Sequence, residues 1–296
     1  MPSHPAPLVS VIIPAFRARA FIADAVQSVL SQDAAPGFEI LVSPDDGEAY
    51  DELRALASPP ILQLLPPAGH HGVSWARNRA VDAARGELLA LCDADDRWPP
   101  NYLAAITPLA LAHGAACAPT RYTDWHGRAF RIPDIGTSRL ALAAFARSLA
   151  SIRPVWAKRL GVRFQAIFAE DVLHTLHLVA LVEGGLPITG ETWYELRART
   201  GSASESTEAN ERRIIAAHTE TIVRACSVPD QLGLEALPAS SRATIVHALE
   251  FWRFANITYL AAGGGASFMQ FVAGREAALW GQFINAAAPP TAGATA

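Results

Sequence analysis

Three aspartates within four residues are the clearest candidates for chemistry in this chain. Asp93, Asp95 and Asp96 directly follow the apolar run Leu88 to Cys92, which predicts a buried strand. Residues i and i+2 of an extended chain point to the same side, so the carboxylates of Asp93 and Asp95 could share a cation. Mg²⁺ or Mn²⁺ prefers such oxygen ligands and keeps positions open for phosphate oxygens. The alternative is a solvated acidic turn that caps the next helix.

A second acidic pair, Glu170-Asp171, opens an apolar helical pattern that runs to Leu181. Burial can raise the pKa of a carboxyl group toward the range in which it serves as a general base. Acidic residues in a first helical turn also interact favourably with the helix dipole. The pair therefore indicates either a base or a helix start.

The elements that must position these residues alternate along the first half of the chain. Apolar runs predict strands at residues 9–13, 39–42, 61–65, 88–92 and 115–118, and periodic patterns predict helices at 21–30, 51–57, 73–84 and 101–113. This alternation is typical of βαβ units and a mostly parallel sheet, which binds ligands at the carboxyl ends of its strands. The acidic groups Asp45-Asp46 and Asp93 to Asp96 both fall at such ends, which indicates a site for a cation and a polar ligand.

The second half of the chain has a different pattern. Residues 138–150 and 169–181 are expected to be helical, as is most of 211–283, with breaks near Pro229, Pro238 and Gly263. We expect an α/β domain over residues 1–210, a helical C-terminal extension over 211–285 and a disordered tail over 286–296. The uncharged stretch 254–274 is interrupted by glycines and predicts helix, turn and helix rather than a membrane span.

Composition excludes several classes of protein. The 296 residues are 51% hydrophobic and 18% charged, with a net charge of −4, which excludes disorder of the whole chain and argues against a nucleic-acid partner. The 3 cysteines are widely spaced, so neither a disulfide framework nor a thiolate zinc site is expected. No signal peptide is visible at the N-terminus, and we expect a cytoplasmic protein.

Several segments, in their order and spacing, resemble the family 2 glycosyltransferases of GT-A fold. The resemblance is strongest over residues 8–103 and weaker over 161–204. Its main segments are Ser10 to Phe16, Glu39 to Gly47, Gly72 to Asn78, Ala84 to Asp96 and Trp98-Pro99. The resemblance implies a Rossmann-like, mostly parallel sheet flanked by helices. It also implies transfer of a sugar from a nucleotide-diphosphate donor with inversion.

The resemblance also assigns a donor site. It places the nucleotide base on Pro14, Ala15 and Phe16, and the base or ribose on Asp45 or Asp46. Ser43-Pro44 makes the preceding strand one residue longer than the family pattern, which leaves open which aspartate faces the nucleotide.

The same resemblance extends to phosphate, metal and base. Arg77 would pair with a phosphate or orient an aspartate. Asp93 and Ala94 would contact the donor, and the metal ligands would be Asp95 with Asp93 or Asp96. Asp171 would be the base, with Glu170 beside it.

Two groups of arginine and lysine residues could have either a functional or a structural role. Arg197 and Arg199 stand where many relatives have a histidine that helps the metal, and either could contact the diphosphate or hold the fold. A cluster beside Trp156 could bind an anionic or lipid-linked acceptor at a membrane surface, or form a solvated edge; its members are Arg153, Lys158, Arg159 and Arg163.

We therefore expect a hexosyltransferase of polysaccharide or glycoconjugate synthesis that uses Mg²⁺ or Mn²⁺. The expected donor is a nucleotide-sugar, a UDP-sugar first, and the expected acceptor is a sugar or a lipid-linked group. A peripheral contact with the inner face of the membrane and a homodimer stay open. The alternatives are a nucleotidyltransferase, a catalytically inactive nucleotide-binding relative and a retaining transferase.

Overall fold

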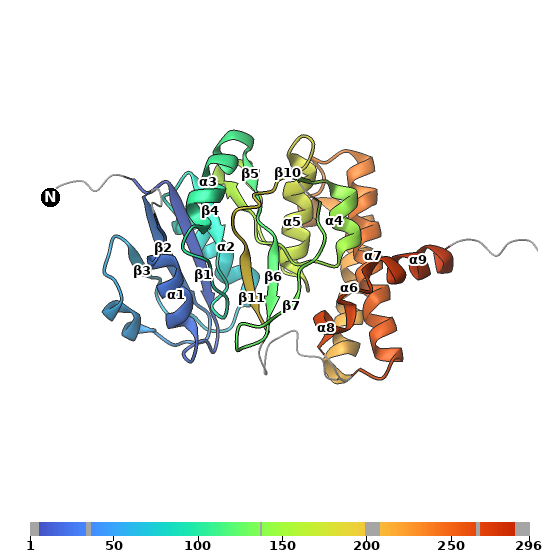
Figure 1. Cartoon of the computed structure of the whole chain (residues 1–296), viewed down its shortest axis with the longest axis horizontal. Coiled ribbons are helices and arrows are strands. Elements are labelled where there is room, and N and C mark those ends of the chain that lie inside the picture. Colours follow the sequence, from blue (N-terminus) through green and yellow to red (C-terminus); the bar gives the residue numbers. More distant parts are fainter. Residues whose placement is uncertain (1–5, 34–36, 137, 199–207, 265–266, 288–296) are drawn as a thin grey trace, which may run out of the picture.

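The apolar runs of the first half form one sheet. The computed structural model describes residues 6–33, 37–136, 138–198, 208–264 and 267–287, and among these the sheet has six strands in the order β3-β2-β1-β4-β9-β5 (Figure 1). Their bounds are β1 Val9–Ala15, β2 Phe38–Pro44, β3 Leu62–Leu64, β4 Leu88–Leu91, β5 Ala115–Ala116 and β9 Val155–Ala157. The first four strands are parallel, and β9 runs antiparallel to both of its neighbours.

Alternation along β1 divides the core into two layers. Val9, Val11 and Ile13 pack with α1 (Ile22–Leu30) and α3 (Tyr102–His113) on one face of the sheet. Ile12 belongs to the opposite layer, which contains α2 (Val73–Ala83). This is the period-2 arrangement of side chains that a buried parallel strand requires.

The helices of the second half extend the layer that contains α2. They pack beside the sheet at the right of Figure 1, and their apolar side chains join those of α2 in one continuous core. Their bounds are α4 Leu142–Ser148, α5 Glu170–Leu181, α6 Glu208–Ser227, α7 Ala239–Ala261, α8 Phe268–Val272 and α9 Glu276–Ala287.

Small elements complete the described part of the chain. One small sheet has the order β11-β6-β7 and another pairs β10 with β8. Their bounds are β6 Thr120–Thr123, β7 Ala129–Arg131, β8 Arg139–Leu140, β10 Leu186–Pro187 and β11 Tyr194–Arg197. Short 3₁₀ helices span Asp51–Ala55, Lys158–Leu160 and Pro229–Leu232.

The predicted fold class is confirmed: a mostly parallel sheet is flanked by helices and followed by C-terminal helices. One local prediction was wrong, since the helix expected at 51–57 is a 3₁₀ turn. The strand β9 was not predicted, because prolines and charges interrupt the pattern around it. The division at residues 210 and 285 stays a prediction, and 288–296 of the predicted tail lie outside the described residues.

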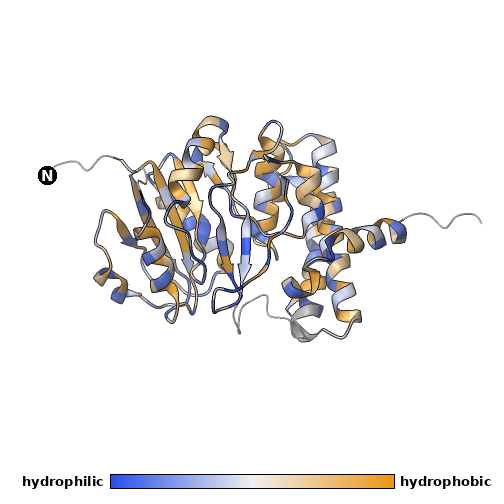
Figure 2. Ribbon diagram, viewed as in Figure 1, coloured by the Kyte–Doolittle hydropathy of each residue, from blue (hydrophilic) through white to orange (hydrophobic). Residues whose placement is uncertain are grey.

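The uncharged stretch 254–274 folds as predicted. Helix α7 ends at Ala261 and α8 begins at Phe268, so the glycines separate two helices. In Figure 2 the C-terminal helices carry both hydrophobic and hydrophilic residues along their length. Within the described ranges, no helix is both long enough and apolar enough to cross a membrane.

Gly86 gives a direct test of how closely the chain packs at the start of β4. A Cβ there would lie 2.6 Å from the backbone nitrogen of Ser10 and 2.8 Å from the carbonyl carbon of Val9. Because neither backbone atom can move without disturbing β1, Gly86→Ala should lower the free energy of unfolding by about 1–3 kcal/mol. Urea denaturation measures this change. Gly190→Ala is the control, since nothing lies within 4 Å of its added Cβ, and an equal loss in both variants would contradict the packing.

Candidate functional site

Parallel pairing brings the ends of three strands to one edge of the sheet. β1 lies between β2 and β4, and Ile12 is aligned with Leu91. Ser43 and Pro44, which lengthen β2 relative to the family pattern, stay paired with β1: Ser43 is opposite Pro14 and Pro44 is opposite Ala15. The segments that follow these strands therefore lie together, as expected for ligand binding at the carboxyl ends of a parallel sheet.

The two aspartates after β2 have different surroundings. Asp45 is 2% exposed, and its carboxylate accepts the backbone N–H groups of His71 and Gly72 at 2.9 and 2.8 Å. Asp46 is only partly buried, and its carboxylate accepts the N–H of Arg17 at 2.6 Å and the hydroxyl of Tyr50 at 2.7 Å. Asp45 thus fixes the loop before α2, whereas Asp46 fixes the exit of β1 and remains accessible.

Aromatic rings are exposed beside these aspartates. Phe16 is 38% exposed, and its ring lies 4.4 Å from that of His70, centroid to centroid. The guanidinium of Arg17 lies 5.2 Å from the centre of the Phe16 ring. Rings at this edge can stack on a flat heterocycle, and the fixed loop through His71 holds His70 in place.

Five charged side chains form a buried network behind the acidic turn after β4. Arg77 on α2 donates to Oδ1 of Asp93 at 2.7 Å and, through its other Nη, to Glu170. Arg153 donates through Nε and Nη2 to Oδ2 of Asp93, at 3.0 and 2.7 Å, and through Nη1 to Oδ2 of Asp171 at 2.6 Å. Since Glu170 and Asp171 are adjacent at the start of α5, the network links the turn after β4 and the middle of α2 to that helix.

The network moves the pKa values of its carboxyl groups in opposite directions. Burial would raise the pKa of Asp93, but Arg77 and Arg153 bring it below its ordinary value. Burial also opposes Arg153 and Arg77 at Asp171, whose pKa is again lowered. For Glu170, burial outweighs Arg77, and the pKa is raised. Burial alone would raise the pKa of Asp171, but Arg153 and Arg77 beside it reverse that direction.

The acidic turn itself is held by β11. The hydroxyl of Tyr194 accepts the N–H of Asp93 at 3.0 Å and donates to Asp96 at 2.7 Å. The backbone N–H of Arg197 donates to the other oxygen of Asp96, and its Nε donates to the carbonyl of Asp95. Burial and the neighbouring aspartates Asp95 and Asp93 raise the pKa of Asp96. Arg197 therefore positions this turn from β11.

The three aspartates fit a cation to different extents. Both oxygens of Asp93 accept from arginines, and both oxygens of buried Asp96 accept from Tyr194 and Arg197. Asp95 lies between them, partly exposed. The sequence resemblance names Asp95 first as a metal ligand, and its partial exposure agrees with that role. Among the described residues, no group of three or more histidine, cysteine, aspartate or glutamate side chains is arranged to hold a metal ion.

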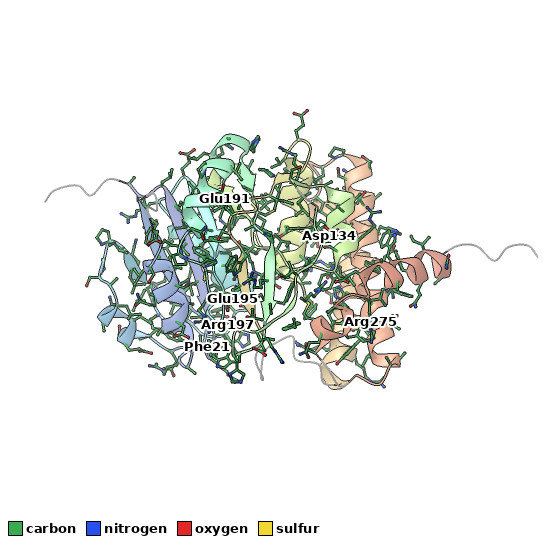
Figure 3. All side chains as sticks on the ribbon, in the orientation of Figure 1. Phe21, Asp134, Glu191, Glu195, Arg197 and Arg275 are labelled. Atoms are coloured by element: carbon green, nitrogen blue, oxygen red, sulfur yellow. The ribbon has the colours of Figure 1, made fainter. Side chains whose placement is uncertain are left out.

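The segment between β6 and β7 contributes aromatic surface beside Arg197, which holds the acidic turn. Figure 3 shows Arg197 on β11 near Phe21, which precedes α1. Trp125, between β6 and β7, connects them: the Arg197 guanidinium lies 4.4 Å from its ring centre, and Phe21 lies 6.2 Å away, ring to ring. Trp125 is 41% exposed, so an aromatic surface borders the turn on this side as well.

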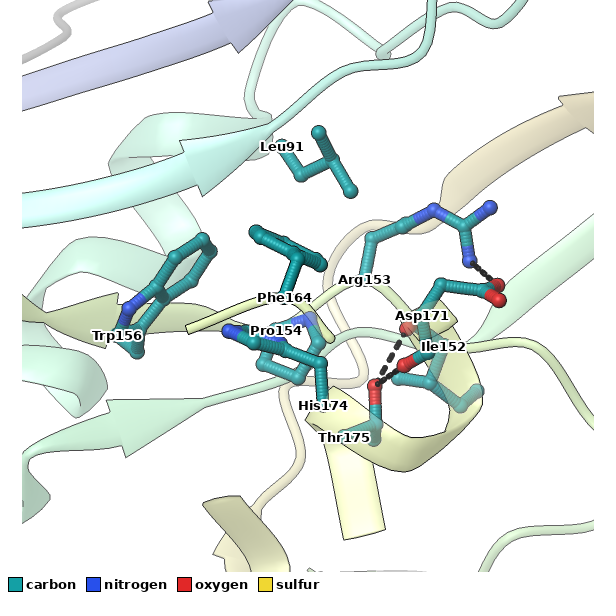
Figure 4. Close-up of a pocket in the computed structure, with 9 residues that line it drawn as sticks. All are labelled: Leu91, Ile152, Arg153, Pro154, Trp156, Phe164, Asp171, His174 and Thr175. Atoms are coloured by element: carbon teal, nitrogen blue, oxygen red, sulfur yellow. Dashed lines mark hydrogen bonds and ion pairs between the residues drawn. The ribbon is translucent and has the colours of Figure 1, made fainter. Parts of the chain in front are cut away.

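Closely packed aromatic rings lie next to Asp171, the candidate base. Figure 4 shows Asp171 bonded to Arg153. Both side chains line a narrow space that has no room for a water molecule. His174, one turn farther along α5, stacks on Phe164 at 4.1 Å and 9° and meets Trp156 edge to face. Burial lowers the pKa of His174 to about 3, so this histidine fills an aromatic position as a neutral ring.

Most predicted site residues are brought together. One edge of the sheet carries the end of β1 with Pro14, Ala15 and Phe16, the aspartate pair after β2, and the acidic turn that contains Ala94. Arg77 on α2 and the Glu170-Asp171 pair on α5 approach this edge from the helices. Arg199 lies outside the described residues.

The basic cluster is divided, because Arg153 is buried whereas Lys158 and Arg159 are exposed. Arg153 is buried in the ionic network, Lys158 donates to the carbonyl of Ala84, and Arg163 pairs with Asp82. The sequence reasoning assigned no role to Ser151 or Tyr194, both of which hydrogen-bond aspartates of the site. Arg153 was predicted only as a member of the basic cluster, so its contacts with Asp93 and Asp171 were missed.

Comparisons with known proteins point to one family. The sequence matches the family described as Glycosyl transferase family 2 over residues 10–158, about half of the chain. UDP-Glc:α-D-GlcNAc-diphosphoundecaprenol β-1,3-glucosyltransferase WfgD of Escherichia coli is 36% identical over 97 residues, which are 32% of this chain and 38% of WfgD. The chain spans less than half of the length of the curated relatives that it matches.

Solved structures share the fold at low sequence identity. TarS of S. aureus in complex with UDP-GlcNAc has a TM-score of 0.57 at 16% identity, covering 86% of this chain and 92% of that chain. Mannosyltransferase PcManGT of Pyrobaculum calidifontis, in complex with GDP-Man and Mn²⁺, has a TM-score of 0.52 at 18% identity, covering 95% and 81%. Both likenesses concern the fold alone.

Proposed function

The chain belongs to glycosyl transferase family 2, and from that premise we propose that it transfers a hexose from a nucleotide-diphosphate donor to an acceptor hydroxyl with inversion. The observation that carries the proposal is one shared edge of the sheet. There the end of β1 lies beside the acidic turn after β4, because β1 and β4 are paired, and Arg77 and Arg153 join that turn to the buried carboxylates of α5. In this proposal the donor, the leaving group and the base would lie within one connected site.

The donor nucleotide would lie at the ends of β1 and β2. Phe16 offers an exposed ring for the base. Asp46 is the accessible aspartate of its pair, whereas Asp45 is buried against the backbone of His71 and Gly72, which favours Asp46 for contact with the base or ribose. Arg77 would act by orienting Asp93, since both of its Nη atoms are bonded to carboxylates.

Asp95 would hold the divalent cation, Mg²⁺ or Mn²⁺. One protein carboxylate leaves the remaining coordination positions to diphosphate oxygens and water, which suits Mg²⁺ in particular. The bound cation supplies Lewis-acid stabilisation of the negative charge on the departing nucleoside diphosphate. Asp93 and Asp96 would fix the turn that presents Asp95, through Arg77, Arg153, Tyr194 and the backbone of Arg197.

Asp171 would act as the base. Its carboxylate is ionised at neutral pH because Arg153 and Arg77 lower its pKa. It would accept the proton of the acceptor hydroxyl while that oxygen bonds to the anomeric carbon and the bond from that carbon to the diphosphate oxygen breaks. Attack from the side opposite the leaving group inverts the configuration. Glu170, on the Arg77 side, would complete the charge network.

The acceptor is proposed by analogy. The name of WfgD gives a GlcNAc-diphosphoundecaprenol acceptor and a UDP-Glc donor for that protein. For this chain we propose a UDP-sugar donor and a lipid-linked or free sugar acceptor in polysaccharide or glycoconjugate synthesis. We also propose that the chain acts in the cytoplasm, at the inner face of the membrane.

Product analysis tests the reaction class. The full chain is incubated with UDP-, GDP- and dTDP-hexoses, Mn²⁺ and a diphospholipid-linked sugar, and the released phosphate species and the new glycosidic bond are identified by mass spectrometry and NMR. The proposal expects a free nucleoside diphosphate and an inverted linkage. Release of pyrophosphate would identify a nucleotidyltransferase, a retained linkage would contradict the role of Asp171, and binding without turnover would identify an inactive relative.

A further inference from the structure

The segment before β9 holds one oxygen of Asp171 from two directions. Arg153 is 8% exposed and donates through Nη1 to Oδ2 of Asp171 at 2.6 Å. The hydroxyl of Ser151 donates to the same Oδ2. The other edge of the Arg153 guanidinium, Nε and Nη2, is bonded to Asp93. A planar, forked guanidinium of this kind fixes both carboxylates in relation to each other.

The second carboxylate oxygen of Asp171, Oδ1, has different surroundings. Within the described part of the chain, no hydrogen-bond donor reaches Oδ1, while both donors converge on Oδ2. The helix α5 also keeps the backbone of Asp171 in place, because its carbonyl accepts the hydroxyl of Thr175 at 2.9 Å, as does the carbonyl of Ile152 (Figure 4). The carboxylate thus presents one particular oxygen.

We propose that Ser151 and Arg153 are positioning residues that hold Oδ2 of Asp171 and thereby present Oδ1 to the acceptor hydroxyl. Through its second contact, on Asp93, Arg153 sets the distance between the base and the donor-binding turn. This inference rests on the proposed function, in which Asp171 is the base. It adds two residues from a segment to which neither the family match nor the sequence assigns a catalytic role.

The charges around Asp171 set the expected pH dependence. The cations that face it are Arg153 and Arg77, and the carboxyl groups are Asp93 and Glu170; His174 on α5 and Tyr122 on β6 are neutral neighbours. A base whose pKa is lowered stays ionised to lower pH, so the activity is lost only when the pH falls through that lowered value. Weakening the Ser151 or Arg153 contact removes part of this effect and moves the acid limb of kcat/KM to higher pH.

The test compares Ser151→Ala and Arg153→Lys with matched controls at the far end of the sheet. There the hydroxyl of Ser10 donates to Glu39 at 2.7 Å, and Arg85 pairs with the other oxygen of the same carboxylate at 2.7 Å. Ser10→Ala and Arg85→Lys therefore remove equivalent contacts outside the site. For all four variants we would measure thermal unfolding, donor binding by calorimetry with UDP and Mn²⁺, and the pH profile of kcat and kcat/KM.

We expect Ser151→Ala to lower kcat about 10-fold, as loss of one charged hydrogen bond in the transition state would. Its UDP affinity should stay within about twofold, since Ser151 does not touch the donor turn. Arg153→Lys should lower kcat further, and both variants should move the acid limb upward. Ser10→Ala and Arg85→Lys should change only the unfolding temperature.

The outcomes separate this inference from the proposed function. Unchanged kcat and pH profile in Ser151→Ala and Arg153→Lys, together with an inactive Asp171→Asn, would overturn the positioning role alone. Full activity of Asp171→Asn would overturn the base assignment and the inference with it. Failure of the wild-type chain to bind any nucleotide or to transfer sugar would overturn the proposed function.

Discussion

Replacing Asp171 with asparagine should lower kcat for sugar transfer by about 10²–10⁴-fold, the usual contribution of a general base. Asparagine has nearly the same shape, and its side-chain oxygen can still accept from Ser151 and Arg153. It cannot take up the proton of an acceptor hydroxyl. Initial rates at saturating donor and acceptor, measured as released nucleoside diphosphate, give the change.

Donor binding separates this effect from loss of structure. Asp171 does not contact Phe16, Asp46 or Asp95, so the Kd for the nucleotide should change little in Asp171→Asn. Asp82→Asn is the control, because Asp82 is an exposed aspartate paired with Arg163 outside the site. A variant with normal nucleotide binding and at least a tenth of the wild-type kcat would contradict the role of Asp171 as base.

Arg77→Met should lower the free energy of unfolding by about 3–5 kcal/mol, the cost of leaving buried charges without their partner. The Arg77 side chain is only 4% exposed and pairs with Asp93 and Glu170, which are 15% and 12% exposed. For a chain of this size the unfolding temperature should fall by about 5–15 °C. Differential scanning calorimetry and urea denaturation at neutral pH measure both quantities.

The stabilising effect of Arg77 should depend on pH in a definite direction. Because Arg77 and Arg153 hold the pKa of Asp93 below its ordinary value, the stabilisation is present at neutral pH and is lost as the pH falls through the lowered pKa. The difference between wild type and Arg77→Met should therefore shrink in acid. Arg163→Met is the control: its pair with Asp82 is 38% and 66% exposed, and such pairs contribute about 0–1 kcal/mol. Equal losses in both variants would contradict the buried network.

The sequence was sufficient to predict the sheet and the edge at which the candidate site lies. The apolar runs at 9–13, 39–42 and 88–92 are short and carry branched residues, so the strands themselves could be predicted. Their ends could not, because β1 continues through Pro14 to Ala15 and β2 continues to Pro44. Once these strands are parallel, the acidic turns must meet. The weaker signals were misread: β9 is only three residues long, between Pro154 and a charged turn, and gave no periodic pattern.

The partners of the acidic residues could not be predicted from the sequence. Ser151 and Arg153 lie 20 and 18 residues before Asp171, and Arg153 lies 60 residues after Asp93, separations at which no local rule applies. The direction of the Asp171 pKa depends on these contacts, because burial alone would have raised it. The same limitation concealed Tyr194, whose hydroxyl joins Asp93 and Asp96 across about 100 residues.

The most direct test of the central claim, a nucleotide-diphosphate site assisted by a metal at Asp95, is binding of nucleotides to the full chain. Thermal shift and calorimetry would be recorded with UDP, GDP, dTDP and CDP, each with and without Mn²⁺, because a ligand of the native state raises the unfolding temperature. The same series on Asp95→Ala, with exposed Asp51→Ala as control, locates the metal. The account predicts a Mn²⁺-dependent shift with one nucleotide, UDP first, that Asp95→Ala loses and Asp51→Ala keeps. No shift with any nucleotide, or an unchanged Mn²⁺-dependent shift in Asp95→Ala, would contradict it.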